Sequence, residues 1–137
     1  MRNVGKTPTP IDILEIISDP LSMDIINAIS SEVTSSDNLM KFLDMSPKKY
    51  YSRYSRLMNV GLIGRREGKI VLSSFGWVVY KTQLTIANAF LHSQELRIID
   101  AVKHAGLSDV EQKLVIDKIF DDTELKNLVV EVLTPDS

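Results

Sequence analysis

One short stretch, residues 62–73, is the only part of the chain whose pattern is typical of β-structure. The apolar runs Leu62-Ile63 and Ile70-Val71-Leu72 flank a polar segment, 64–69, that contains two glycines. Two β-rich runs around a Gly-containing polar turn predict a β-hairpin. In the rest of the chain the apolar residues recur at helical spacing. The sequence therefore predicts a mainly α fold in which strand is confined to one hairpin.

Helix start signals organise the remaining sequence. Asp19-Pro20 and Ser46-Pro47 each place an N-cap residue before a proline at the first helical position, which predicts helices over 20–31 and 47–59. Thr7-Pro8-Thr9-Pro10 resists helix, so residues 1–10 are expected to be an extended leader. Further helices are expected over 11–18 and 38–43 (burying Leu39, Met40, Phe42 and Leu43), from Phe75 to Gly106 with or without a break near Ser93, and after the caps at Ser108 and Asp121-Asp122.

Length and composition indicate an ordinary globular protein. The chain has 137 residues, enough for one domain or for a small domain with a helical appendage. It has no cysteine, which excludes disulfides, zinc ribbons, Fe–S sites and a thiol nucleophile. No stretch approaches the roughly 18 apolar residues of a membrane span, and no apolar core follows the N-terminus. We therefore expect a soluble cytoplasmic protein without a membrane partner.

The formal net charge of −2 conceals an uneven distribution. Residues 1–40 hold two basic and six acidic residues, and residues 82–137 hold five basic and ten acidic residues. Residues 41–81 hold nine basic and two acidic residues, so the three segments carry −4, +7 and −5. Charge asymmetry of this kind indicates a localised site for a polyanion.

The predicted helix 47–59 has two chemically different faces. At 100° per residue, Tyr50, Tyr54, Leu57 and Met58 fall within about 80° of one another and form an apolar, aromatic inner face. The opposite face is basic and hydrogen-bonding, contains no acidic residue, and consists of Lys49, Ser52, Arg53 and Arg56. Such a face suits a helix in a DNA major groove, where Arg and Lys reach guanine edges and phosphates.

The elements around this helix complete a recognisable unit. The preceding helix and the turn Asp44-Met45-Ser46 supply the rest of a helix-turn-helix. The hairpin that follows carries Arg65, Arg66 and Lys69 around its tip. A basic hairpin beside a recognition helix is a wing, which follows an adjacent groove and its phosphates.

The run Asn38–Tyr80, about a third of the chain, resembles the winged helix-turn-helix of archaeal ArsR/MarR-like transcriptional regulators. The similarity lies in the order and spacing of four segments: Leu39-Met40-Lys41-Phe42-Leu43, Ser46-Pro47-Lys48-Lys49-Tyr50-Tyr51-Ser52-Arg53, Arg56-Leu57 to Gly61-Leu62-Ile63, and Gly68-Lys69-Ile70-Val71-Leu72-Ser73-Ser74-Phe75-Gly76. ArsR-type metal sensors use cysteine ligands, which this chain lacks. The resemblance implies binding to double-stranded DNA, usually as a homodimer.

On this interpretation residues 11–80 form the DNA-binding domain and residues 81–137 form a helical extension that mediates dimerisation. Lys49, Ser52, Arg53 and Arg56 would face base edges and phosphates. The complete predicted interface adds Ser46 and Lys48 at the helix start, Tyr51 as a phosphate donor, and Arg65, Arg66 and Lys69 on the wing. No cofactor is expected, and whether a small-molecule effector binds is left open.

The same residues also have simpler interpretations. Basic residues on a helix often form only a solvated face. Tyr50, Tyr51 and Tyr54 would suit base stacking on single strands, but helical phase favours Tyr50 and Tyr54 as core residues and places Tyr51 at the boundary. Trp77 is expected to be a core anchor between the wing and the long helix.

The C-terminal third leaves two further questions. His92, Asp100 and His104 would share one side of a continuous helix and suit a metal site, although an exposed His and a helix-terminal His are favoured over it. The apolar stripes of 96–133 are either the core of one subunit or, as we favour, a dimer interface.

No enzymatic activity is expected, because the sequence contains no phosphate-binding glycine loop, nucleophile elbow or catalytic His/carboxylate cluster. The alternative to DNA binding is a winged helix that serves as a protein-interaction subunit of a transcription or replication assembly.

Overall fold

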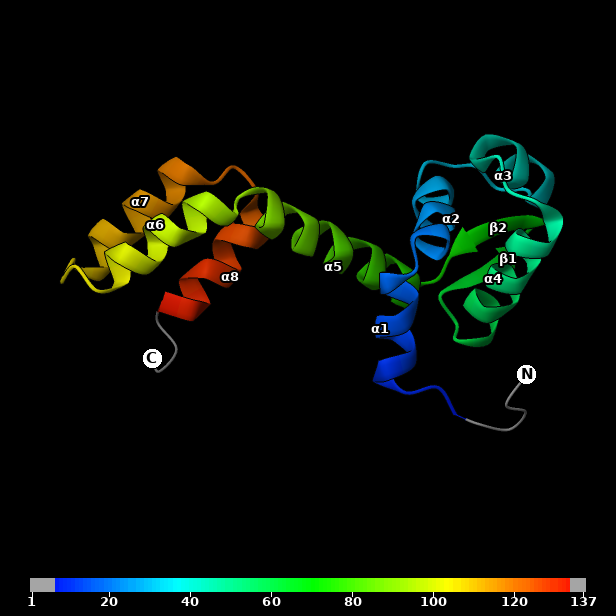
Figure 1. Ribbon diagram of the computed structural model, residues 1–137, viewed down its shortest axis with the longest axis horizontal. Coiled ribbons are helices and arrows are strands. Elements are labelled where there is room, and N and C mark those ends of the chain that lie inside the picture. Colours follow the sequence, from blue (N-terminus) through cyan, green and yellow to red (C-terminus); the bar gives the residue numbers. More distant parts are fainter. Residues whose placement is uncertain (1–6, 134–137) are drawn as a thin grey trace. The chain divides into compact units, whose positions relative to one another are not determined.

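The computed structural model describes residues 7–133 (Figure 1). The chain divides into two compact units, of which the first ends at Lys81 and the second begins at Thr82. The first contains α1 (Pro10–Ser18), α2 (Pro20–Ser30), α3 (Ser36–Leu43), α4 (Pro47–Asn59), β1 (Ile63–Arg66), β2 (Lys69–Leu72) and the beginning of α5 (Ser74–Leu91). The second contains the end of α5 and α6 (Ser93–Lys103), α7 (Asp109–Ile119) and α8 (Thr123–Leu133). The prediction of a mainly helical chain with one small antiparallel sheet is confirmed.

Most helices begin where their capping residues predict. The Asp19 side chain accepts a hydrogen bond from the Ser22 N–H, and Ser46 accepts one from Lys49. The predicted capping box of Ser108 and Glu111 is present at the start of α7. The leader prediction is wrong at its end: Pro10 is already the first residue of α1, while residues 1–6 lie outside the described part.

The hairpin has a defined register and a two-residue turn. Ile63 pairs with Leu72 and Arg66 pairs with Lys69. Glu67 and Gly68 form the turn and both have positive φ, 54° and 77°, as a type I′ turn requires. On its other edge β2 is joined to the loop between α2 and α3, because the Ile70 N–H donates to the Thr34 carbonyl over 2.9 Å.

The core of the first unit lies between α1–α4 and the inner face of the hairpin. Its fully buried side chains include Ile16, Ile25, Ile26, Leu39, Tyr50, Leu57, Leu62 and Ile70. The alternation of the strands places Ile63, Ile70 and Leu72 in this core. These strand residues share one core with Tyr50 and Leu57 of α4, so the hairpin is held against that helix.

Two residues predicted to be buried are exposed. Phe42 is 68 % exposed. The short helix α3 turns Leu39, Met40 and Leu43 toward the core. Phe42 lies about 100° around the helix from the middle of that buried face. Trp77 is 44 % exposed because α5 packs on the core through Gly76 and Val79. It lies at the edge of that face, with its ring 5.7 Å from the ring of Tyr80.

The second unit has its own core. Ile99, Ile116, Phe120, Leu125 and Val129, from α6, α7 and α8, pack together and are buried. These residues of the 96–133 stripes therefore form the core of one subunit, and assigning them to a dimer interface is wrong.

The long helix after the hairpin is broken at His92. Helix α5 ends at Leu91 and α6 begins at Ser93, while the His92 ring packs edge-on against Phe120 at 5.8 Å. The continuous-helix alternative is therefore wrong. Within residues 7–133, none of the helices has both the length and the apolar character that crossing a membrane requires.

Candidate nucleic-acid interface

The N-terminal half of α4 presents a polar, positively charged surface. Lys48, Lys49, Tyr51 and Ser52 are all exposed, and Ser46 caps the helix through its hydroxyl. Within the described residues, neither Lys48 nor Lys49 has a carboxylate at ion-pair distance. The two ammonium groups are therefore available to an external anion, at a helix end whose dipole also favours negative charge.

The C-terminal half of the same face is used within the fold. Arg53 Nε lies 3.1 Å from Asp19 Oδ2, and the Arg53 guanidinium also donates to the Lys49 carbonyl over 3.2 Å. Arg56 lies 3.1 Å from Glu15 in a more exposed pair. Arg53 and Arg56 thus contact the ends of α1 and α2, an arrangement that helical phase alone did not indicate.

Asp19 has two roles, as the cap of α2 and as the partner of Arg53. Burial raises the pKa of the Asp19 carboxyl, but hydrogen bonds from Ser22 and Arg53 and the positive charge of Arg53 lower it by more. The net pKa lies below the ordinary 3.8. The carboxylate is therefore ionised at neutral pH and holds Arg53 against α2.

This pair predicts an acid-sensitive contribution to stability. In Arg53→Met the free energy of unfolding at pH 7 should fall by about 1 kcal/mol, because a partly buried, hydrogen-bonded ion pair is lost. The Asp19 contribution is complete above pH 3.8 and is lost as the pH falls through the lower pKa of the folded state. The difference between wild type and variant should therefore shrink below pH 3.8 in urea unfolding.

Arg56→Met is the matched control for this experiment. The Arg56 and Glu15 side chains are 42 % and 59 % exposed, so solvent screens their attraction. We expect the unfolding midpoint of Arg56→Met to equal that of the wild type. If both variants lost the same free energy of unfolding, the Arg53–Asp19 pair would stabilise the fold no more than the exposed Arg56–Glu15 pair does.

Tyrosines anchor α4 from its inner face. The Tyr50 ring is fully buried, its hydroxyl lies 2.9 Å from Ser36 Oγ, and burial raises the pKa of that hydroxyl. The rings of Tyr50 and Tyr54 stack with centroids 5.6 Å apart. Tyr50 is therefore a core residue, as expected, and Tyr54 is half-buried. Tyr51 is 46 % exposed and stays on the candidate surface.

The three cations of the hairpin lie on two different faces. Arg65 is on the side that faces α4: its Nε donates to the Tyr54 hydroxyl over 3.2 Å, and its guanidinium lies 5.9 Å from the centre of that ring. Arg66 and Lys69 pair across the hairpin on the other side. There they line an open groove of about 540 Å³ together with Glu32 and Trp77. Arg65 therefore ties the hairpin to the Tyr54 side of α4.

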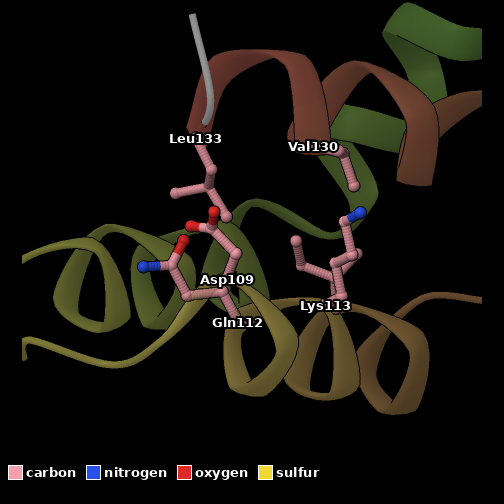
Figure 2. Close-up of a pocket in the computed structure, with 6 residues that line it drawn as sticks. Asp109, Gln112, Lys113, Val130 and Leu133 are labelled. Carbon is pink, nitrogen blue, oxygen red and sulfur yellow. The ribbon is translucent and has the colours of Figure 1, made fainter. Parts of the chain in front are cut away.

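The second unit has a small pocket between α7 and α8. The pocket between α7 and α8 is lined by Asp109, Gln112, Lys113, Val130 and Leu133 (Figure 2). Its volume of about 10 Å³ has room for at most one water molecule. This pocket is too small for an organic effector.

The metal-site alternative is not supported by the arrangement of its residues. His92 contacts Glu95 at 3.7 Å, and His104 follows the end of α6. No group of three His, Asp or Glu side chains within residues 7–133 is placed to hold a metal ion.

The exposed lysines in the N-terminal half of α4 thus form a positively charged surface of the first unit without a carboxylate partner among the described residues. No protein-family model, curated protein or solved structure matches the chain, so its function has to be inferred from this geometry.

Proposed function

We propose that the chain is a duplex-DNA-binding transcriptional regulator whose residues 11–80 form a winged helix-turn-helix. In this proposal α3 and α4 are the helix-turn-helix, α4 enters the major groove, and the hairpin 62–73 is the wing. The observation that carries the proposal is the exposed pair Lys48 and Lys49 in the N-terminal half of α4. These lysines project from a helix without acidic residues that is anchored from behind by buried Tyr50.

The proposal gives different tasks to the cations of α4. In a helix-turn-helix the N-terminal residues of the recognition helix contact base edges. Lys48, Lys49, Tyr51 and Ser52 occupy that part of α4. Arg53, held by the partly buried Asp19, would instead fix the orientation of α4 on α2, whereas Arg56 forms only an exposed pair with Glu15. In this proposal the base contacts that select the DNA sequence are therefore made by residues in the first half of α4.

The wing would add contacts to the DNA backbone. Arg65 lies beside Tyr54 on the side of the hairpin that faces α4, and in this proposal it would contact phosphates flanking the groove that α4 enters. Arg66 and Lys69, on the opposite face of the hairpin, would contact phosphates only near its tip. As for other regulators of this architecture, we propose that the protein acts as a homodimer through the region 81–137, so that two such surfaces engage two half-sites.

The proposal is tested by removing the two exposed lysines together. Lys48→Ala with Lys49→Ala should weaken binding to a duplex by about 10- to 100-fold. It should also reduce the slope of log K against log salt by about 2, because two phosphate contacts are lost. Fluorescence anisotropy with a labelled duplex, titrated at several salt concentrations, measures both quantities. The duplex is taken from a selection of bound sequences out of a random library.

Lys113→Ala with Lys118→Ala is the matched control. It removes the same charge from exposed positions on α7, and its affinity and salt slope should equal those of the wild type. If both double variants lost the same duplex affinity, the effect would come from the net charge of the protein and not from the α4 surface. No duplex binding by the wild type at low salt would contradict the proposed function.

One observation favours a second candidate, a winged helix that binds a protein. Phe42 on α3 is 68 % exposed and takes no part in the core of the first unit. A stoichiometric protein partner that is lost in Phe42→Ala, combined with no duplex binding, would favour this candidate.

A further inference from the structure

An open groove lies along the outer edge of β2. Its volume is about 540 Å³, and its walls come from β2, from the end of α2 with the loop that follows, and from the start of α5. At this edge the Ile70 N–H donates to the Thr34 carbonyl. The backbone groups of an antiparallel strand point to the same edge at every second residue. The N–H and carbonyl of Leu72, which also lines the groove, therefore point to that edge as well.

The groove combines apolar side chains with an exposed aromatic ring. Ile29, Ile70 and Leu72 line it and are at most 7 % exposed. Trp77, from the first turn of α5, also lines it and is 44 % exposed, although its ring contacts that of Tyr80. A tryptophan of this kind beside buried apolar side chains is typical of the anchor points of protein interfaces. The groove therefore favours a partner that offers an apolar side chain.

The charges of the groove select the charge of that partner. Arg66 and Lys69 pair across the hairpin, and both are exposed and line the groove. Within residues 7–133 neither of them has a carboxylate at ion-pair distance. Glu32 is the one acidic residue among the described residues that line the groove. The pattern therefore favours a partner with an acidic group for the two cations and without a negative charge at Glu32.

These features together favour a peptide over other anions. A nucleic-acid strand carries a negative charge at every phosphate, so one of its phosphates would meet Glu32. A small anion would leave Trp77 and the apolar side chains uncovered, in a groove too open to enclose it. An extended peptide can place an acidic side chain at the cations and an apolar one at Trp77, while its backbone pairs with that of Leu72.

We propose that this groove binds an extended segment of another protein that carries both acidic and apolar side chains. The acidic side chains contact Arg66 and Lys69, and an apolar side chain packs on Trp77. The inference concerns the side of the hairpin that faces away from α4 and does not depend on DNA binding.

A display library of random seven-residue peptides, selected on the immobilised full chain, tests the proposal. The enriched peptides should contain Asp or Glu together with apolar residues. An enriched peptide, added without a label, should change the emission of Trp77, since this single tryptophan lines the groove. A selection without enrichment, or enriched peptides that leave the emission of Trp77 unchanged, would contradict the proposal.

Variants of the charged residues test the assigned contacts, with the Kd of the enriched peptide measured by fluorescence anisotropy. Arg66→Ala with Lys69→Ala should raise this Kd by about 10-fold or more, whereas Glu32→Gln should lower it, because a like charge is removed. Lys113→Ala with Lys118→Ala, on exposed positions of α7, is the matched control and should leave the Kd unchanged. All variants should keep the far-UV circular dichroism of the wild type. Equal losses in the two double variants, or weaker binding by Glu32→Gln, would overturn the proposal.

Competition identifies any other occupant of the groove. Displacement of the peptide by a single-stranded oligonucleotide or by inorganic phosphate at comparable concentration would assign the groove to a nucleic acid or to a small anion. Self-association of the wild type that is lost in Arg66→Ala with Lys69→Ala would assign it to a second copy of the chain. Each of these results would contradict the proposal. A chain that binds the peptide but no duplex supports the groove and contradicts the proposed DNA binding, so the two proposals fail independently.

Discussion

Replacing Gly76 with alanine is expected to destabilise the first unit by about 3 kcal/mol. Gly76 lies in the first turns of α5, where a Cβ atom would overlap the carbonyl oxygen of Leu62. That oxygen belongs to the backbone at the base of the hairpin and cannot move without shifting β1. In a helix Gly→Ala normally stabilises by about 1 kcal/mol, so the sign of the effect is itself diagnostic. Urea unfolding followed by the fluorescence of Trp77, the single tryptophan, measures it.

Gly64→Ala is the matched control. Gly64 lies in β1, and a Cβ atom there would have no neighbour within 4 Å. The unfolding midpoint of this variant should equal or slightly exceed that of the wild type, because alanine restricts the unfolded chain. If Gly76→Ala also left the midpoint unchanged, α5 would not pack directly on the hairpin base.

The features that could be predicted from sequence are those determined by neighbouring residues. Asp19, Ser46 and Ser108 each accept a hydrogen bond from a backbone N–H three residues later, so their effect is readable in a short window. The hairpin is equally local, since residues 66–69 close its turn. The element order of the first unit was therefore predictable without knowledge of packing.

Burial was predictable only in part. Helical period shows which residues share a face, but the width of the covered arc depends on the neighbouring elements. Leu39 and Tyr50 lie in the middle of their faces and are buried, whereas Phe42 and Trp77 lie at the margins and are exposed. The sequence left the long helix either continuous or broken near Ser93; the structure breaks it at His92, whose ring packs against Phe120, far along the chain.

The candidate site was predicted as a set of residues but not as an arrangement. Arg53 and Asp19 are 34 positions apart, and Arg56 and Glu15 are 41 apart, so no local pattern reveals these pairs. Helical phase put all four polar residues of the α4 face into one set, whereas the structure divides them into the exposed Lys49 and Ser52 and the ion-paired Arg53 and Arg56. Strand alternation would have separated Arg65 from Arg66, because successive side chains point to opposite faces.

Replacing Phe120 with alanine is expected to destabilise the second unit by about 3–5 kcal/mol. Phe120 is fully buried and joins the C-terminal end of α7 to His92 and to the core residues of α6 and α8. Truncation removes apolar contacts and leaves a cavity in a small core, so a loss of this size should unfold α6–α8 near physiological temperature. Far-UV circular dichroism should show an early transition, while Trp77 fluorescence should report an unchanged transition of the first unit.

Leu114→Ala is the control, since Leu114 lies on α7 but is 56 % exposed and should cost less than about 1 kcal/mol. Loss of the second unit also removes the Thr85 and Asn88 contacts that orient the end of α5. Under the proposal that residues 81–137 hold two copies together on DNA, Phe120→Ala should be monomeric and should bind a palindromic duplex more weakly, although the surface of α4 is intact. If the Trp77 transition shifted together with the circular dichroism, the two units would unfold as one, and the loss of DNA affinity would no longer separate dimerisation from folding.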